Sequence, residues 1–479
     1  MVSQQFVNNS ILLEFRLIIF TFSYIYYQIM KKLFILSLAI SLFTCKEEPK
    51  IDYVVLSGKI ENPKTNSVSI TNGTQKIVEI PIEEDGTFSD TLNVANGYYN
   101  LDHGREVAYI YFEQGDNINV SLDTKEFDET IKYTGNGSAK NNFLAEKVLI
   151  EEKADLDIAK VYAMEEPEFI AIMEDLKNSK VKSLENKDNL SSEFKSIEKK
   201  NIDYDYLINL LNYPSYHKHF AKKAEFKPSD DLTKRFSNID YNNEKDYEAL
   251  DSYKRLVQIH YANKLRDSDN PSLIFEEVSK TSIDVLKEDL SKSLRYDISP
   301  SNEHLKAYYD GIINLSTDEK YKQEISTKYS KVSKLAKGMP SPSFVEYENH
   351  KGGTTSLEDL RGKYVYVDVW ATWCGPCIRE IPALKEVEKQ FHGKNIAFVS
   401  TSIDKASAHN TWVEMVKNKE LGGIQLMADN DWNSQFVKDY AIEGIPRFIL
   451  IDPDGNIVSA DAPRPSNPKL VELFKELNI

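Results

Sequence analysis

The sequence predicts a multidomain protein with an N-terminal all-β sandwich, a central α-helical region and a C-terminal α/β domain. Its 479 residues are about three times the length of a typical single domain, so we expect the chain to be divided. Short alternating apolar and polar runs give way to a stretch rich in Lys, Glu, Leu and Tyr, which is followed by strands alternating with helices. We expect a β-rich domain over 46–139, a helical domain over 140–336 and the α/β domain over 337–479.

The composition is that of a folded chain with a soluble surface. Hydrophobic residues make up 41% and charged residues 28%, which is enough for apolar cores inside an ordinary polar surface. The formal net charge is −16, and no cluster of Lys and Arg compensates for it locally. Because phosphate backbones would repel such a chain, we expect no nucleic acid partner.

Residues 1–45 read as an upstream extension followed by an export signal. Two apolar runs flank Lys31 and Lys32, and each is shorter than the roughly 20 residues that cross a bilayer as a helix. From Met30 onward the order is Met-Lys-Lys, an apolar core and then Cys45, which is typical of a secretory signal. We therefore expect Met30 to be the working start.

The segment LFTCKEEPK resembles a bacterial lipoprotein signal, in which the cysteine becomes the lipid-carrying first residue. The resemblance implies lipidation at Cys45 and an anchor in a membrane. Thr44 departs from the pattern, because such signals usually have Gly, Ala or Ser there. An uncleaved membrane anchor is the alternative, and either reading places the bulk of the chain outside the cytoplasm.

The β-rich region, residues 53–134, alternates apolar and polar residues in short runs. Turn signals separate these runs, which include VVLSGKIEN, SVSITN, AYIYFEQ and NINVSLD. A side-chain period of two between turns predicts a β-sandwich or barrel.

The helical region extends over residues 141–334. Four apolar residues recur at three-to-four spacing within YEALDSYKRLVQIHYANKL: Leu250, Tyr253, Val257 and Tyr261. We expect this stripe to be a packed helix face, and His260 to be a packed or surface residue rather than a ligand.

The last region begins near Gly338 and alternates strands with helices. The stretches SFVEYEN, KYVYVDVW, IAFVSTSID and RFILIDPDGNIVSAD read as strands or hairpins. Between and after them, PCIREIPALKEVEKQF, an insert containing Trp412 and NPKLVELFKEL read as helices. The alternation predicts an α/β domain.

The chain has only three cysteines, so the chemistry of its CxxC pair is narrowly limited. With Cys45 assigned to a lipid, only Cys374 and Cys377 can pair. A zinc site would need a second CxxC or a histidine pair at ligand spacing, and haem attachment would need a histidine where Ile378 stands. We expect neither a metal nor a cofactor, and a redox role for the pair.

With WCGPC opening a helix, the last 140 residues or so resemble the TlpA-like and ResA-like extracytoplasmic thioredoxins. Four pieces occur in the order of that family: GMPSPSF, VDVWATWCGPC, a long insert and EGIPRFILIDPDG. The resemblance implies a thioredoxin fold with a central insert. EDGTFSDTL and YTGNGSAKNNFL further resemble a β-rich domain of unknown function often found ahead of such modules, which brings no catalytic residues with it.

The two cysteines are expected to have different roles. At a helix N-terminus, free backbone N–H groups and the helix dipole would stabilise the Cys374 thiolate and make it the nucleophile. Cys377, one turn further on, would be the resolving thiol. Pro376 fits the first helical turn, and Pro382 is expected to kink the helix without ending it. Trp373 is expected to shield the disulfide.

Two carboxylates are candidates for the proton acceptor. Asp368 lies on the strand VYVDV, on the face opposite its valines, and matches the buried acid of thioredoxins. Glu380 lies three residues after Cys377 on the same helix face, and it matches the acidic residue of ResA-like reductases. The sequence leaves open which of the two titrates with the thiols.

Ile445-Pro446 resembles the cis-proline turn that faces the CxxC in this family, where it would receive a substrate segment and keep metals from the sulfurs. The Gly-Pro dipeptide is that of thioredoxin, a reductant at about −270 mV. The resemblance therefore implies a reductase of the cell envelope. Its substrates would be disulfide-bearing envelope proteins such as apocytochrome c, and a membrane thiol transporter would supply electrons.

Three alternatives remain. The protein could be a thiol oxidase or isomerase with the same site. A peroxiredoxin-like peroxidase shares the fold but needs a threonine where Ala371 stands. The third is an adaptor, in which the first 300 or so residues bind a client that the redox module then serves.

Overall fold

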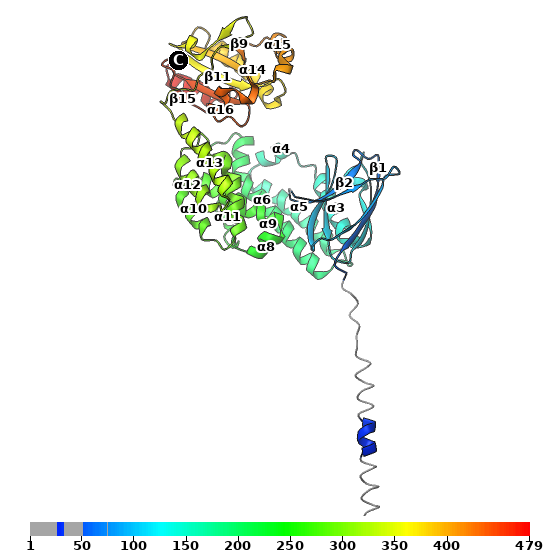
Figure 1. Cartoon of the computed structure of the whole chain (residues 1–479). Helices are drawn as coiled ribbons and strands as arrows, with labels where there is room; N and C mark the ends of the chain where they lie inside the picture. Colours follow the sequence, from blue (N-terminus) through cyan, green and yellow to red (C-terminus); the bar gives the residue numbers. More distant parts are fainter. Residues whose placement is uncertain (1–25, 33–50, 74) are drawn as a thin grey trace, which may run out of the picture. The chain divides into compact units, whose positions relative to one another are not determined.

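The computed structural model describes residues 26–32, 51–73 and 75–479 (Figure 1). Cys45 and most of the expected export signal lie outside the described residues. Within the described ranges, no helix combines the length and the apolar character needed to cross a membrane.

The first compact unit contains the described residues of 51–154 together with Asn186–Phe194, and its core is a β-sandwich. One sheet has the strand order β4-β1-β7-β8 and the other β3-β2-β5-β6. Inward-facing side chains of both sheets form one apolar cluster, as the alternating pattern predicts. The strands are β1 (Val54–Glu61), β2 (Ser67–Asn72), β3 (Gln75–Pro81), β4 (Thr87–Leu92), β5 (Gly97–His103), β6 (Glu106–Phe112), β7 (Asn117–Asp123) and β8 (Lys132–Asn136), with the short helix α2 (Phe127–Thr130) before β8.

Helix α3 (Ser138–Lys153) closes one edge of each sheet through neighbouring asparagines. Asn141 Oδ1 accepts the N–H of Tyr111 on β6 at 2.7 Å, and its Nδ2 donates to the Tyr111 carbonyl at 3.1 Å. Asn142 makes the same pair of bonds with Tyr133 on β8, at 2.9 and 2.7 Å. Each amide thus takes the place of a missing strand and satisfies edge groups that would otherwise be unpaired.

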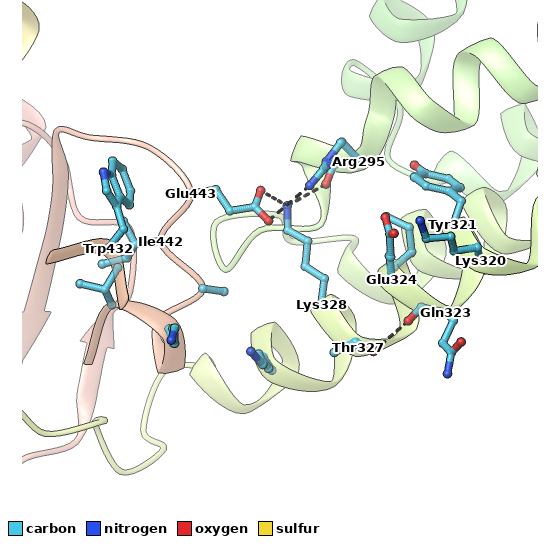
Figure 2. A pocket seen from close by; sticks show the side chains of 15 residues that line it. Arg295, Lys320, Tyr321, Gln323, Glu324, Thr327, Lys328, Trp432, Ile442 and Glu443 are labelled. Atoms are coloured by element: carbon cyan, nitrogen blue, oxygen red, sulfur yellow. Dashed lines mark hydrogen bonds and ion pairs between the residues drawn. The ribbon is translucent and has the colours of Figure 1, made fainter. Parts of the chain in front are cut away.

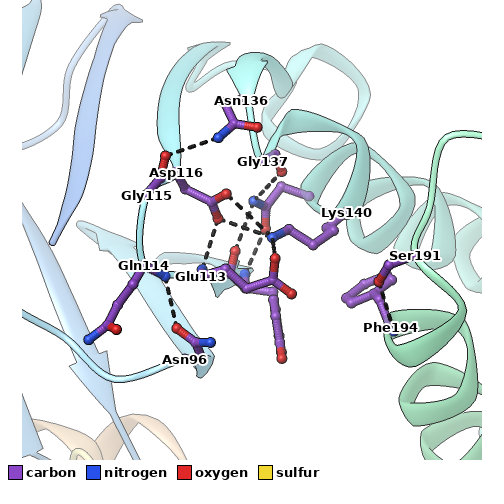
Figure 3. Close-up of polar contacts among 12 residues, drawn as sticks. Asn96, Glu113, Gln114, Gly115, Asp116, Asn136, Gly137, Lys140, Ser191 and Phe194 are labelled. Atoms are coloured by element: carbon purple, nitrogen blue, oxygen red, sulfur yellow. Dashed lines mark hydrogen bonds and ion pairs between the residues drawn. The ribbon is translucent and has the colours of Figure 1, made fainter. Parts of the chain in front are cut away.

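A buried ion pair fixes the start of α3 (Figure 3). Lys140 Nζ lies 3.1 Å from Asp116 Oδ2 and 2.7 Å from Glu113 Oε2. Gly137, at φ +91°, leaves room for the Asp116 carboxylate, which a Cβ at this position would overlap. The stretch YTGNGSAKNNFL therefore has a structural role in joining the helix to the sandwich.

The second compact unit contains Asp155–Glu185 and Lys195–Ile479, and its first part is helical. Its helices are α4 (Ile158–Ala163), α5 (Glu166–Glu185), α6 (Ser192–Phe220, which begins in the first unit), α7 (Asp230–Lys234), α8 (Glu244–Ala249), α9 (Asp251–Arg266), α10 (Pro271–Ser279), α11 (Asp284–Ser293), α12 (Leu305–Leu315) and α13 (Glu319–Val332), with 3₁₀ turns at Leu294–Asp297 and Ser333–Leu335. Tyr253, Val257 and Tyr261 are buried on α9 as expected, whereas Leu250 precedes the helix.

His260 is packed against an aromatic ring. Its imidazole stacks on Tyr241 with ring centroids 3.7 Å apart, and burial lowers its pKa to about 4. A neutral, stacked imidazole agrees with the expectation of a packed residue.

The C-terminal part is a seven-stranded sheet in the order β10-β9-β13-β12-β11-β14-β15. Strand β11, in the interior of the sheet, runs parallel to β12 and antiparallel to β14. This is the thioredoxin-like α/β arrangement that the sequence predicts. The elements are β9 (Tyr347–Asn349), β10 (Thr354–Thr355), β11 (Tyr364–Trp370), α14 (Gly375–Gln390), β12 (Ile396–Ser402), α15 (His409–Asn418), β13 (Ile424–Met427), α16 (Gln435–Asp439), β14 (Arg447–Ile451), β15 (Ile457–Ser459) and α17 (Lys469–Glu476), with 3₁₀ turns at Leu357–Leu360, Ala406–Ala408 and Asp431–Asn433.

Apolar clusters cover both faces of this sheet. Alternate valines of β11 belong to a cluster that includes both cysteines and Trp412 of α15. Tyr366 belongs to the opposite cluster, with apolar residues of α14 and Phe474 of α17. Asp368, two residues from Tyr366, follows the same alternation and faces away from the valines.

Candidate active site

The CxxC pair lies between the end of strand β11 and the start of helix α14. Cys374 is the N-cap of α14, and it forms a disulfide with Cys377 across a Cα–Cα distance of 5.3 Å. Cys374 Sγ accepts the backbone N–H of Cys377 at 3.2 Å. After reduction the same N–H and the positive end of the helix would face the Cys374 thiolate, so the site favours the charged form of this sulfur. The helix continues through Pro382, as expected.

The exposed fractions of the site residues differ widely. In the disulfide form both cysteines are only 4% exposed, whereas Trp373 is 60% exposed. The sulfurs belong to an apolar cluster with Trp370 and Ala371, which leaves the indole of Trp373 on the solvent side.

Asp368 is a buried acid on the strand that leads to the cysteines. Burial, together with the negative charges of Glu380 and Glu388, raises its pKa to about 8. Its Oδ1 atom has no hydrogen-bond partner among the described residues. With this pKa, the carboxyl can take up or release a proton near neutral pH.

Glu380, the second expected acid, is anchored away from the strand. Its carboxylate accepts hydrogen bonds from the backbone N–H and the hydroxyl of Ser466, at 3.0 and 2.9 Å. Glu380 still acts on Asp368 through its charge. The structure thus brings the two candidate acids into one electrostatic group.

Two further acids of this site were missed by sequence reasoning. Glu388 lies eight residues, about two turns, beyond Glu380 on α14, and burial raises its pKa. Asp404, 1% exposed, accepts the N–H and the hydroxyl of Thr372, each at 2.8 Å, and so holds the turn before Cys374. The spacing of Glu380 and Glu388 on one helix could have indicated Glu388 from the sequence. No sequence pattern indicated Asp404, because it lies 32 residues from Thr372.

The Ile445–Pro446 peptide is cis. Ile445 packs against the apolar cluster that contains both cysteines, so this turn and the CxxC border the same core. Within the described residues, no group of three or more His, Cys, Asp or Glu side chains is arranged to hold a metal.

A pocket of about 600 Å³ lies beside the chain segment that leads to Pro446, and residues of α13 and of the segment after β13 line it. Figure 2 shows the Glu443 carboxylate beside Lys328 and Arg295. This carboxylate lies 3.5 Å from Arg295 Nη2 and 2.9 Å from Lys328 Nζ. Both sides of the pocket belong to the second compact unit.

Comparison with known proteins matches the C-terminal part of the chain. The Redoxin family model matches residues 336–473. The thiol-disulfide oxidoreductase ResA of Bacillus cereus (strain ATCC 10987 / NRS 248) is 27% identical over 150 residues, which are 31% of this chain and 83% of that protein. ResA of Bacillus subtilis (strain 168) is 29% identical over 126 residues, 26% of this chain and 66% of that protein.

Solved structures give similar matches. A putative thiol-disulfide oxidoreductase from Bacteroides vulgatus is 38% identical, with 30% of this chain and 98% of that chain covered and a TM-score of 0.28. The solution structure of another putative thiol-disulfide oxidoreductase from Bacteroides vulgatus is 53% identical. The match covers 30% of this chain and 92% of that chain, with a TM-score of 0.27. The family match, the ResA relatives and the CxxC pair at the start of α14 confirm that the C-terminal part of this chain is a ResA-like domain of the thioredoxin family and that the protein is a thiol-disulfide oxidoreductase.

Proposed function

We propose that this protein reduces disulfides of substrate proteins outside the cytoplasm by dithiol exchange at Cys374 and Cys377. The observation that carries the proposal is the position of Cys374 Sγ at the N-terminus of α14, where it accepts the Cys377 N–H at 3.2 Å. Helix-terminal N–H groups stabilise a thiolate, and the thiolate is the attacking species in exchange.

The reaction proceeds in two displacements. The Cys374 thiolate attacks a substrate disulfide, forms a mixed disulfide and releases the first substrate sulfur. Cys377 then gives its proton to the Asp368 carboxylate and attacks Cys374 Sγ, which releases the second substrate sulfur and leaves the Cys374–Cys377 disulfide. A further dithiol must reduce this disulfide, and we propose a membrane thiol transporter as that donor.

The direction of the reaction is tested by the reduction potential of the pair, measured by equilibration in defined thiol buffers. A value near or below about −250 mV supports the reductase, since thioredoxin lies at about −270 mV. A value near −120 mV, as in strongly oxidising family members, would instead make the protein an oxidase or isomerase.

The proposed location is the cell envelope, with the protein held in a membrane by a lipid on Cys45. The support is the order Met-Lys-Lys, apolar core and LFTC at the N-terminus. Disulfide-bearing envelope proteins, apocytochrome c among them, are the proposed substrates. The acidic charge of the chain argues against a nucleic acid partner.

The pocket beside Glu443 favours an additional role in binding clients. Its lining carries five basic and two acidic side chains: Arg295, Lys320, Lys328, Lys331 and Lys438 against Glu324 and Glu443. The pocket thus has a local excess of positive charge, although the chain has a net charge of −16. Opposite charge steers association, so an acidic segment of a substrate protein fits this pocket better than a basic one.

A further inference from the structure

A small cavity separates Asp368 from the outer part of α14. Its volume is about 10 Å³, roughly the space that one water molecule needs. Three buried polar atoms of its lining residues have no hydrogen-bond partner among the described residues: Asp368 Oδ1, Trp370 Nε1 and Gln425 Oε1. Unpaired buried polar atoms are costly, and a single water can bridge two to four of them. The cavity therefore has the size and the polar atoms of a water site.

Glu388 lines the same cavity from α14 and is only partly buried. The glycine pair Gly422-Gly423 makes room for its carboxylate: a Cβ at 422 would overlap Oε2, and a Cβ at 423 would lie 3.0 Å from Oε1. Burial raises the pKa of Glu388, while the charges of Lys385 and Lys351 lower it. Glu388 thus lies between the cavity and two lysines that are themselves at least partly exposed.

We propose that Glu388 carries to solvent the proton that Asp368 takes from Cys377, through one water held in this cavity. The inference rests on the proposed dithiol exchange. Glu388 acts through Asp368, so it is a relay and positioning residue rather than a catalytic one.

Atoms and electrons are conserved in the proposed step. When Cys377 Sγ bonds to Cys374 Sγ, the bond between Cys374 and the substrate sulfur breaks and the substrate leaves as a thiolate. The Cys377 proton moves to Asp368, then through the water to Glu388 and to solvent, from which the substrate thiolate takes up a proton. The electron pair stays with the substrate, so no further oxidant or reductant is needed.

The surroundings of Asp368 offer few other routes for this proton. Its neighbours in the sheet are Ser400 on β12 and Phe448 on β14, and neither titrates. Tyr366 lies on the same strand, and its pKa is raised well above the ordinary value, mainly by burial. The remaining charged groups are Glu380, which is bonded to Ser466, and Glu388. Among the described residues, Glu388 and Lys385 share the cavity with Asp368, and of these two only Glu388 is a carboxylate. The Lys385 ammonium donates to the Lys419 carbonyl.

The test compares Glu388→Gln with Glu386→Gln in the full-length protein, because Glu386 is an exposed acid on the same helix. The rate of the step in which Cys377 resolves a preformed mixed disulfide is measured from pH 5 to 10, in H₂O and in D₂O. For Glu388→Gln we expect the rate at high pH to fall roughly tenfold and its solvent isotope effect to increase, since general acid–base groups contribute at least this much. Glu388→Asp should restore part of the rate, and Glu386→Gln should behave as the wild type.

A purely electrostatic role gives a different result. If Glu388→Gln moves the midpoint of the profile but keeps the wild-type rate at high pH, the relay is wrong although the proposed function stands. If the wild-type protein exchanges no disulfide, the proposed function itself fails. Gln425→Leu provides a second test, because it removes a polar atom that would hold the water and keeps Glu388. This variant should show the same loss of rate, and an unchanged rate at high pH would also overturn the relay.

Discussion

Glu380 and Ser466 join the active-site helix to the C-terminal end of the domain, because the Glu380 carboxylate accepts both the N–H and the hydroxyl of Ser466. Ser466 lies just before α17. The bonded carboxylate raises the pKa of Asp368 through its charge. The two acids that the sequence left as alternatives are therefore not independent: Asp368 is the buried group, and Glu380 modulates it.

Glu380→Gln should shift the pH dependence of the resolving step. Removing the negative charge lowers the pKa of Asp368, so the carboxylate that accepts the Cys377 proton forms at lower pH. We expect the midpoint to move down by roughly 0.5 to 1 pH unit, the range for loss of one nearby like charge. Stopped-flow tryptophan fluorescence measures the profile, with Glu386→Gln as the control. An unchanged midpoint would contradict the coupling of the two acids.

Asp368→Asn should stabilise the C-terminal domain in a pH-dependent way. The pKa of Asp368 is about 8 in the folded protein against an ordinary value of 3.8, so between these pH values the folded state retains a proton that the unfolded chain releases. Stability is therefore lost as the pH rises through this window. Removing the group should raise the free energy of unfolding by a few kcal/mol at pH 7 and by little at pH 4.

Tryptophan fluorescence during urea unfolding measures this effect, because all four tryptophans of the chain lie between residues 370 and 432. Asp439→Asn is a suitable control, since Asp439 is an exposed acid of the same domain. Equal stabilisation at pH 4 and pH 8 would show that the raised pKa is not the cause.

Local sequence patterns predicted the features that depend on local geometry. The period of two along VYVDV places Asp368 opposite the valines, and the helix start at WCGPC makes Cys374 the N-cap. The stripe on α9 is buried, because a spacing of three to four marks one helix face.

Features that depend on distant contacts were not predicted. The exposure of Trp373 depends on which side chains pack around the sulfurs. The spacing of residues along the sequence does not show which side chains these are. Asp404 reaches Thr372 only because parallel β12 brings its end beside the end of β11. Glu388 meets Asp368 across a cavity that Gln425 of β13 helps to line.

Cys377→Ser should accumulate mixed disulfides through Cys374. Without the resolving thiol the second displacement cannot occur, so the substrate remains bonded to Cys374 Sγ. Non-reducing gels of envelope fractions should show thiol-sensitive adducts. The double variant Cys374→Ser/Cys377→Ser is the control and should form none. Failure of Cys377→Ser to trap any protein would argue against this exchange route.

Cys45→Ser should release the protein from membranes. A lipid on Cys45 is the proposed anchor, and its removal leaves no acyl chain to hold the protein. Fractionation of cells, followed by detection of the protein in soluble and membrane fractions, measures the change. Continued association of the Cys45→Ser protein with membranes would favour the alternative of an uncleaved N-terminal anchor.

Charge reversal in the pocket beside Glu443 should weaken reduction of acidic substrates selectively. Lys320, Lys331 and Lys438 are exposed residues that line this pocket. Changing all three to Glu reverses the sign of the local field, so an acidic peptide disulfide should lose roughly tenfold or more in kcat/KM at low salt. A small neutral disulfide should react at the wild-type rate, because Cys374 and its surroundings are unchanged.

The matched control changes the exposed residues Lys394, Lys417 and Lys475 to Glu, which alters the net charge equally but leaves the pocket intact. If the loss follows net charge alone, both triple variants should slow the acidic peptide to the same extent, and the pocket would have no part in substrate binding. If the pocket binds the acidic segment, only the first variant should be affected. High salt should then reduce the wild-type preference for the acidic peptide, because screening weakens attraction between exposed charges.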